Sequence, residues 1–418
     1  MTLSEARATD HSILIDPDPA ANAAVAAQHD GRRTSRRSVV RAAAMGAVTV
    51  LVVGTGALSV RVFDSEVLDP DGGQAYDTWR RWRNAQGPLG LVAAATLAAS
   101  PHNTQPWTFH VTESSIDLFA DPARRIDALD PLGREHFVGL GCALENLVIA
   151  AGQRGTPATV TLLPDGPAGG HVAHVELSKG PSTISPLYES IGRRHSNRGP
   201  YRPTPVARPV LDGLVDAADL PGVTVQWLTT VEDRATLGQL LVDAAKAVTA
   251  DERQSSEGFA WFRSSDADIQ RYRDGLTLDA QGLSPFMLTM AKLLPPSTRT
   301  AGDSFWLQQT KNVHTKTAAA YGVITVADPT DVALQLLGGR LLQRIHLTAT
   351  AGGIAMQHMN QITERIDREQ VTNVAASFAP RFAGLLPAGA KPLATFRVGQ
   401  AERAARLSPR RAVASVSQ

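Results

Sequence analysis

Two stretches of the chain repeat apolar residues at the three- and four-residue spacing of one helical face. The first runs over residues 137–151 and stops at Gly152, and the second runs over residues 334–349 and stops at Gly352. This spacing predicts two long helices, each with one buried face, that end where glycine interrupts the pattern.

Each predicted helix is followed, after an intervening segment, by a short run of alternating apolar and polar residues, at 172–177 and at 393–398. Alternation of this kind is typical of half-buried strands. Because helices dominate and the strands are short, the pattern indicates an α+β fold. We interpret residues 79–182 and 183–418 as two halves of one duplicated plan, which would imitate a symmetric dimer within a single polypeptide.

Residues 251–305 have no counterpart in the first half. They contain their own aromatic residues and turn signals, among them Trp261 and the pair Asp274-Gly275. A long insertion of this kind predicts either a lid over a site or a surface elaboration packed on its own half.

The composition of residues 1–63 predicts a targeting segment rather than a folded domain. Residues 1 to about 30 are polar or rich in alanine, residues 32–41 are basic, and residues 42–60 carry no charge. A Ser-Arg-Arg stretch before an uncharged run resembles a twin-arginine export signal, which implies the twin-arginine export machinery as a partner. The run is either a cleaved signal or a membrane anchor. The protein is then either held at the outer face of the cytoplasmic membrane or released. Residues 64–78 predict a polar linker.

Composition and charge exclude several classes of binding site. The chain has 418 residues, a formal net charge of +1 and one cysteine, Cys142. The charge gives no support to nucleic-acid binding, and one cysteine excludes an internal disulfide framework and a cysteine-rich metal site. His171 and His174 are three residues apart in a predicted strand, so we expect them on opposite faces and predict no metal site there.

The segment 100–107 reads Ser-Pro-His-Asn-Thr-Gln-Pro-Trp and lies between an apolar helix predicted at 91–98 and a strand predicted at 108–111. It offers hydroxyl, imidazole, amide and backbone groups close together, which the polar edge of a flavin ring requires. The alternative is an ordinary polar turn with Trp107 in the core.

The segment 194–198 reads Arg-His-Ser-Asn-Arg. In an extended chain Arg194, Ser196 and Arg198 share one face, and two guanidinium groups with a hydroxyl suit a phosphate monoester. The alternative is a solvated basic turn. Arg410 and Arg411, near the C-terminus, are further candidates for the same phosphate.

Together these segments resemble the nitroreductase family of FMN-binding flavoproteins. The full octapeptide, the Asp-Pro-Leu-Gly-Arg-Glu stretch at 130–135 and the Asp-Gly-x-x-x-Asp-Ala pattern in the insertion resemble its Acg-like branch, and the likeness spans about residues 76–411. In this family one subunit of a dimer holds the FMN phosphate and the other supplies the loop at the ring. By resemblance, the phosphate would be held by Arg194, Ser196, Arg198 and either Arg410 or Arg411, and the ring would be faced by Ser100, Pro101, His102, Asn103 and Thr104. Gln105 and Trp107 would shape the loop.

The departures from the family pattern are complementary. Where the first half should have its own phosphate motif, it has Trp-Arg-Arg-Trp at 79–82, without a serine between the arginines. Where the second half should have its own flavin loop, at 220–227, it has no Asn-Thr. Each half lacks what the other keeps, so we predict one FMN per chain in a pseudo-dimer, an arrangement that allows a monomer.

The expected activity is that of an FMN-dependent oxidoreductase. It would pass electrons from a reduced donor such as NAD(P)H to a small electron-poor acceptor, for example a nitroaromatic compound or a quinone. The alternative is an FMN-binding or sequestering protein with a lid over the site and little turnover. The flavin carries the redox step, so no catalytic side chain is singled out. His102 and His195 would either polarise the bound groups or make structural hydrogen bonds.

Overall fold

The computed structural model describes residues 71–215 and 220–418. The predicted export signal and uncharged run therefore lie outside the described residues. In the described part, no helix combines the length and the apolar character needed to cross a membrane. The predicted linker at 64–78 is described only from residue 71, and it is helical from Gln74 onward.

The first sheet is formed by residues of the first half. Its strands are β1 (Trp107–Val111), β2 (Ser115–Ala120), β3 (Ala158–Leu162) and β4 (His171–Leu177). Their order is β1-β2-β4-β3, and every neighbouring pair is antiparallel. The 20-residue helix α6 (Arg134–Gln153) connects the second strand to the third. It contains the residues whose spacing predicted a helix at 137–151.

The second sheet repeats this order. Its strands are β5 (Val223–Leu228), β8 (Ala320–Val326), β9 (Ala355–His358) and β10 (Lys391–Gly399), arranged β5-β8-β10-β9 with all pairs antiparallel. Helix α14 (Val332–Ala351) again connects the second strand to the third. The predicted strands at 172–177 and 393–398 and the predicted helix at 334–349 are confirmed, and the fold is α+β.

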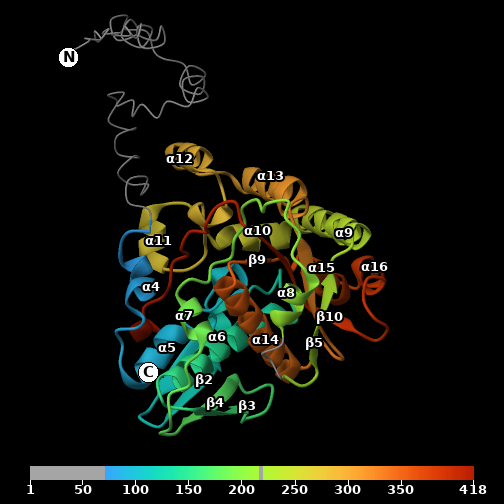
Figure 1. Ribbon diagram of the computed structural model, residues 1–418. Coiled ribbons are helices and arrows are strands. Elements are labelled where there is room, and N and C mark those ends of the chain that lie inside the picture. Colours follow the sequence, from blue (N-terminus) through green and yellow to red (C-terminus); the bar gives the residue numbers. More distant parts are fainter. Residues whose placement is uncertain (1–70, 216–219) are drawn as a thin grey trace, which may run out of the picture. The chain divides into compact units, whose positions relative to one another are not determined.

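Helices α6 and α14 cross at glycines, near the middle of the ribbon in Figure 1. A side-chain carbon on Gly141 would lie 2.1 Å from the Leu336 carbonyl oxygen, and one on Gly339 would lie 2.1 Å from the Val138 carbonyl oxygen. The two backbones can approach this closely only because neither position carries a side chain. One core cluster therefore continues from the first half into the second.

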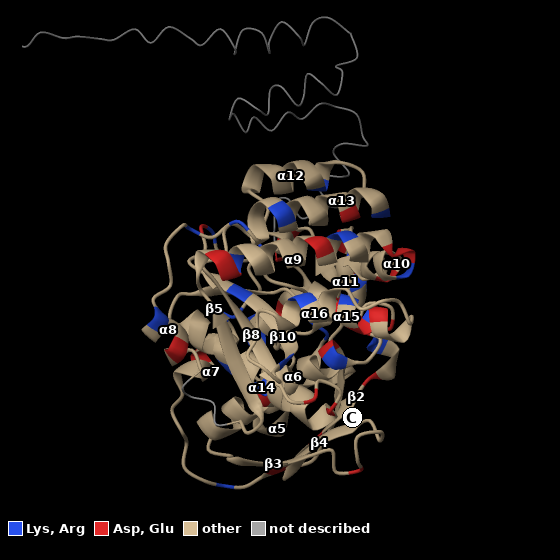
Figure 2. Cartoon of the chain, turned by 90° about the vertical axis from the view of Figure 1, so that its right-hand side faces the viewer, with Lys and Arg blue, Asp and Glu red and all other residues tan. Residues whose placement is uncertain are grey.

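Residues 229–319 separate the first two strands of the second sheet, whereas β1 and β2 of the first sheet are joined by a tight turn. This longer segment includes the predicted 251–305 insertion. It contains α9 (Val231–Ala250), α10 (Glu252–Ala260), β6 (Phe262–Arg263), α11 (Asp266–Tyr272), β7 (Leu276–Thr277), α12 (Pro285–Leu293), α13 (Arg299–Gln309) and a π-helical turn, Thr310–His314. Figures 1 and 2 place α12 and α13 on the side away from β2, β3 and β4.

The helices of this segment begin at polar caps that the sequence supplies. The side chains of Thr230, Asp251, Ser265, Ser284 and Thr298 each accept a backbone N–H at the start of α9, α10, α11, α12 and α13. Such caps satisfy donors that the first helical turn leaves free.

The remaining helices are short. They are α4 (Asp77–Arg81), α5 (Gly87–Ala95), α7 (Pro186–Ile191), α8 (Arg208–Gly213), α15 (Gln361–Val371) and α16 (Phe378–Ala383). The helix predicted at 91–98 is thus shifted: α5 begins at Gly87 and ends at Ala95.

The C-terminal residues return from the second half to the first. Phe109 N–H donates to the Val416 carbonyl over 2.7 Å, and Gln418 N–H donates to the Phe109 carbonyl over 2.9 Å. Arg410 N–H donates to the Ala75 carbonyl. These bonds bring Arg410 and its neighbours alongside the 100–107 loop.

The expectation that His171 and His174 face opposite sides of the sheet is wrong. The register of β2 and β4 shifts between Leu118 and Phe119. As a result both imidazoles reach Asp117, at 2.9 Å from His171 and 2.7 Å from His174. Irregular pairing changes which side chains share a face. Among the described residues, no group of three or more histidine, cysteine or acidic side chains is placed to hold a metal ion.

Candidate functional site

A cavity of about 690 Å³ lies among elements of both halves. Residues 99–103 and α6 of the first half line it, together with residues 194–198, the end of β9 and the start of α15 from the second. Residues of α10, α12 and α13 complete its wall, among them Phe259, Met287 and Trp306. A cavity of several hundred cubic ångströms with apolar walls and a few polar groups is typical of a site for a small molecule or cofactor.

The 100–107 loop adopts a conformation that L-residues rarely take. Ser100 is extended before Pro101, as proline requires of its predecessor. His102, Asn103 and Gln105 then have φ angles of 46°, 57° and 54°. Left-handed conformations at three non-glycine residues cost free energy, and such strain gathers at functional sites where the surroundings impose it.

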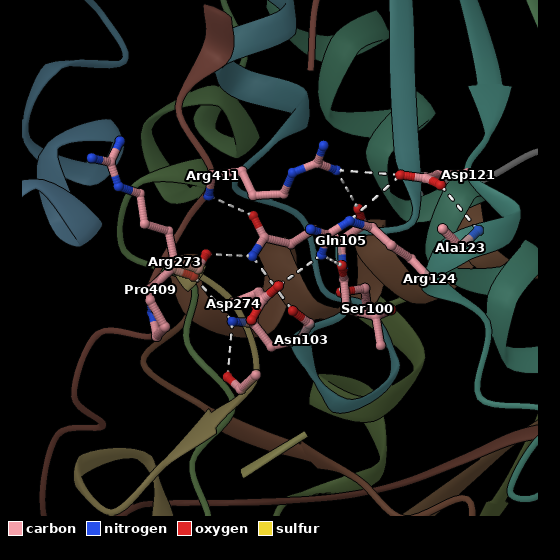
Figure 3. A network of polar contacts seen from close by, with 12 residues as sticks. Ser100, Asn103, Gln105, Asp121, Ala123, Arg124, Arg273, Asp274, Pro409 and Arg411 are labelled. Carbon is pink, nitrogen blue, oxygen red and sulfur yellow. Dashed lines mark hydrogen bonds and ion pairs between the residues drawn. The ribbon is translucent and has the colours of Figure 1, made fainter. Parts of the chain in front are cut away.

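Gln105 holds this loop in place, as Figure 3 shows. Its amide donates to the Arg273 carbonyl over 2.9 Å and accepts from the Arg411 N–H over 2.8 Å. Gln105 is fully buried, and Trp107, the first residue of β1, is buried in the core. Their positions agree with the expected role in shaping the loop.

Asn103 joins the loop to the insertion and to the C-terminal segment. Its amide donates to the carbonyls of Gly275 and Pro409, each over 3.0 Å, and its side-chain oxygen accepts from Arg410 over 2.6 Å. The side chain lines the cavity, but its hydrogen bonds are directed to protein groups. Beside it, Asp274 accepts from Arg124 and is paired with Arg263, which fastens the insertion to the first half.

Arg194, Ser196 and Arg198 all line the cavity, and Arg410 joins them there. Ser196 forms an isolated β-bridge with Met356, which holds this segment extended beside β9. Arg194 donates to the Leu97 carbonyl over 3.0 Å and Arg198 to the Ala280 carbonyl over 3.1 Å. The structure thus brings the 99–103 segment, the 194–198 segment and Arg410, which are far apart in the sequence, to one cavity.

No carboxylate within the described ranges forms an ion pair with Arg194, Arg198 or Arg410. Burial lowers the pKa of Arg194 and of Arg198 to about 10, and it lowers the pKa of Arg410 well below its usual range. The Nε atoms of Arg194 and Arg410 are buried, and neither has a hydrogen-bond partner in the described part of the chain. Buried guanidinium groups with unused donors and no counter-charge fit a phosphate monoester, which supplies both charge and acceptors.

Several histidines lie close to these arginines, and their imidazole rings are uncharged at neutral pH. Burial and the neighbouring arginines lower the pKa of His102 to about 4, and those of His195 and His358 to about 3. The His195 ring meets Trp79 edge-on at 4.6 Å between ring centres. At neutral pH these imidazoles are hydrogen-bonding groups rather than cations.

Two of the predicted cofactor residues do not line the cavity. Thr104 is fully buried behind the loop, and Arg411 contacts the Gln105 carbonyl and lies 3.8 Å from Asp121. Arg410 and Arg411 are adjacent in sequence but face different surroundings. Arg80 and Arg81 of the first half are exposed, and neither lines the cavity.

Sequence reasoning missed several polar residues of the wall. They are Glu135, Gln357, Asn360 and Glu364, and the ion pair of Lys292 with Asp279. The sequence signal for Glu135 was present, because the 130–135 stretch supported the resemblance, but it was not connected with a site. Gln357, Asn360 and Glu364 follow no motif, and only the packing of β9 and α15 brings them to the cavity.

Comparisons with known proteins give partial matches. No family model matches the chain. A Mycobacterium tuberculosis protein named as a candidate NAD(P)H nitroreductase is 28% identical over 180 residues, which are 42% of this chain and 52% of that protein. A second candidate NAD(P)H nitroreductase of the same organism, acg, is 34% identical over 87 residues, 21% of this chain and 26% of that protein. The chain spans about half the length of the first relative and about a quarter of the second.

Solved structures show remote likeness. The FMN-dependent nitroreductase NfnB of Mycobacterium smegmatis, in complex with NADPH, is 16% identical with a TM-score of 0.36, covering 56% of this chain and 98% of its own. A Desulfitobacterium hafniense nitroreductase with bound FMN is 16% identical with a TM-score of 0.33, covering 55% and 95%.

Proposed function

We propose that this chain is an FMN-dependent oxidoreductase of the nitroreductase type, which passes electrons from NAD(P)H to a small electron-poor acceptor. The observation that carries the proposal is the composite cavity, where a strained loop of the first half faces buried, carboxylate-free arginines of the second. The names of the partial relatives, both candidate NAD(P)H nitroreductases, agree with it.

The residues present fit FMN. Arg194, Ser196, Arg198 and Arg410 would hold the phosphate, because the three guanidinium groups line the cavity without a carboxylate partner in the described residues and Arg194 and Arg410 each keep an unused Nε donor. The 100–103 loop would face the ring. Asn103, whose side chain and backbone are both bonded to protein groups, would hold the loop and Arg410 in position beside the ring. Thr104 and Arg411 would support these residues from behind the cavity.

When bound, FMN supplies the redox chemistry, accepting hydride from a nicotinamide and giving electrons to the acceptor. The chain's own residues bind and orient it, and the apolar wall formed by α10, α12 and α13 excludes water from the reacting groups. The neutral histidines His102 and His195 add hydrogen-bonding groups without adding charge.

The two halves are proposed to be a duplication that imitates a dimer and holds one FMN per chain. The identical strand orders, the matching positions of α6 and α14, and their close crossing at glycines support this. The complementary loss of motifs, with Arg80 and Arg81 outside the cavity, supports a single site.

A second candidate function is FMN sequestration with little turnover. It is favoured by the insertion, whose aromatic side chains Phe259, Phe262 and Trp306 form part of the cavity wall and could restrict access of an acceptor.

We also propose that the chain is exported by the twin-arginine route. It would then be anchored at the outer face of the cytoplasmic membrane or released after cleavage. The basic segment 32–41 before the uncharged run 42–60 supports this.

The proposal is tested on the full chain by its absorbance spectrum and by the FMN released on denaturation. We expect a yellow protein with one FMN per chain. Rapid bleaching by NADPH followed by reoxidation with menadione would support the enzyme, and slow bleaching would support sequestration. A protein that is colourless and does not bind added FMN would refute both functions.

A further inference from the structure

Two glutamates from different halves line the cavity together. Glu135 lies in the first turn of α6 and Glu364 in the first turn of α15, and each is at least nine-tenths buried. Both carboxyl groups line the cavity together with Asn360, and each acts on the pKa of the other. One oxygen of Glu135, Oε1, is buried with no hydrogen-bond partner among the described residues.

The position of Glu135 relates the pair to the 100–103 loop. Gly139 follows Glu135 by four residues, so the two share one face of α6. A side-chain carbon on Gly139 would lie 3.1 Å from Pro101 and 3.4 Å from Ser100. Glu135 therefore lies on the face of α6 that packs against the proposed ring-binding loop. It is one turn closer to the start of the helix than Gly139.

The cations nearby are already paired with other acids. Arg134 is bonded to Asp367, and Arg365 and Arg368 are bonded to Asp251. The other charged groups that act on the pair are acidic: Asp130 before α6 and Glu257 on α10. Two neighbouring carboxyl groups without a cation of their own cannot both be ionised cheaply.

Burial is the largest cause that raises the pKa of both groups. It raises that of Glu364 to about 8, and burial and the neighbouring Glu364 raise that of Glu135 well above its usual range. At neutral pH the pair therefore keeps at least one proton, in a cavity whose four lining histidines, His102, His195, His314 and His358, have lowered pKa values and no acidic proton to give.

We propose that the Glu135–Glu364 pair is the proton donor to the electron acceptor bound in this cavity, an inference that rests on the proposed oxidoreductase function. Reduction of a quinone carbonyl by hydride, which derives from NAD(P)H, leaves an oxyanion. A glutamic acid O–H of the pair breaks and gives its proton to that oxygen, forming the hydroxyl of the reduced product. The carboxylate left behind regains a proton from solvent before the next turnover. An acceptor that takes only single electrons needs no such proton.

The test compares two acceptors with the full-length, FMN-loaded protein and the variants Glu135→Gln and Glu364→Gln. Menadione takes up protons when it is reduced, and ferricyanide does not. We expect each variant to lower kcat for menadione about 100-fold, the scale of general acid catalysis, and to leave ferricyanide reduction unchanged. Equal rates with menadione in variants and wild type, or equal losses with both acceptors, would overturn the inference. Failure of the wild type to reduce either acceptor would instead refute the proposed function, and this inference with it.

A second readout does not depend on turnover. Infrared spectra of the full chain should contain a protonated-carboxyl C=O band at pH 7 that weakens as the pH rises through about 8, where Glu364 ionises. The band should be absent from the Glu135→Gln/Glu364→Gln double variant. It should persist in Glu369→Gln, a matched control on α15 whose buried carboxylate accepts from the backbone of Ser377 and Phe378 outside the cavity. A wild type without this band would overturn the inference.

Discussion

At the residue scale, the buried arginines of the cavity lower the stability of the ligand-free protein and raise its affinity for an anion. Arg194, Arg198 and Arg410 are desolvated and have no carboxylate partner in the described residues, so each costs free energy in the absence of an anion. A bound phosphate would relieve that cost. Stability without ligand and affinity for ligand should therefore change in opposite directions when one arginine is removed.

The variant Arg198→Gln tests this opposition. Glutamine removes the charge and keeps a polar side chain, but it ends two bonds short of the nitrogen that donates to the Ala280 carbonyl. We expect it to raise the unfolding temperature of the FMN-free protein and to weaken FMN binding about 100-fold, as loss of a charged phosphate contact of about 3 kcal/mol would. Calorimetry and FMN titration measure the two effects. Arg81→Gln, which removes an exposed arginine outside the cavity, should leave FMN affinity unchanged. Lower stability together with unchanged affinity in Arg198→Gln would contradict the assignment.

The carboxyl pair and the histidines give the free energy of unfolding a predictable pH dependence. Glu364 has a pKa of about 8 when folded and about 4.5 when unfolded, so its contribution is complete below pH 4.5 and lost as the pH rises through 8. His102, His195 and His358 have lowered pKa values, so their contribution is present above pH 6.5 and lost as the pH falls toward 4 and 3. The two effects oppose each other in acid, which leaves pH 6.5–8 as the window where the carboxyl pair acts without these histidines.

Within that window we expect each of the two carboxyl groups to lower the stability of the wild type by at most about 1.4 kcal/mol per pH unit. The variant Glu364→Gln, which cannot ionise at this position, should lose the part of the slope that belongs to Glu364. Urea unfolding at several pH values measures it, with Glu369→Gln as the control that keeps the slope. A wild-type slope of zero between pH 6.5 and 8 would contradict a protonated pair.

At the element scale, the crossing of α6 and α14 joins the halves. Spacing of apolar residues predicted both helices, but it could not indicate that Gly141 and Gly339 lie where the two backbones meet. Gly141→Ala would place a methyl group 2.1 Å from a carbonyl oxygen of the other helix, and the helices would have to separate.

We expect Gly141→Ala to destabilise the protein by roughly 3 kcal/mol, at the upper end of overpacking costs. Gly152→Ala is the matched control. It lies on the same helix, where the nearest atom outside its own helix would be 3.9 Å away, and alanine should stabilise that helix by about 0.5 kcal/mol. Chemical denaturation compares the two. Equal effects would mean that the helices do not depend on this contact.

At the scale of the whole molecule, the C-terminal segment completes the proposed site within one chain. It carries Arg410 from the second half to Asn103 of the first, and residues 416–418 pair with β1. If the halves imitate a dimer, no second copy is needed. We expect sedimentation of detergent-free, FMN-loaded protein to give the mass of one chain with one FMN. Two FMN per chain, or FMN bound only by a dimer, would contradict this prediction.

Local sequence was enough to predict the helices α6 and α14, the strands β4 and β10, and the polar loop before β1. These features depend on backbone periodicity and on the conformational limits of proline and glycine, which act over a few residues. The same reasoning misplaced His171 relative to His174, because a register shift is set by the partner strand. It also misplaced the ends of α5, because helix termini depend on what packs against them.

The sequence by itself determined that arginines alternate with a serine at 194–198, that an Asn-Thr loop occurs once, and that each half lacks the other's motif. Tertiary structure decided which of these groups meet. It directed Arg410 into the cavity and Arg411 away from it, used Asn103 to join three segments, and brought Glu135 and Glu364 together from opposite halves. The physical reason is that residue spacing determines which face of an element a side chain occupies, whereas packing and strand register determine what that face meets.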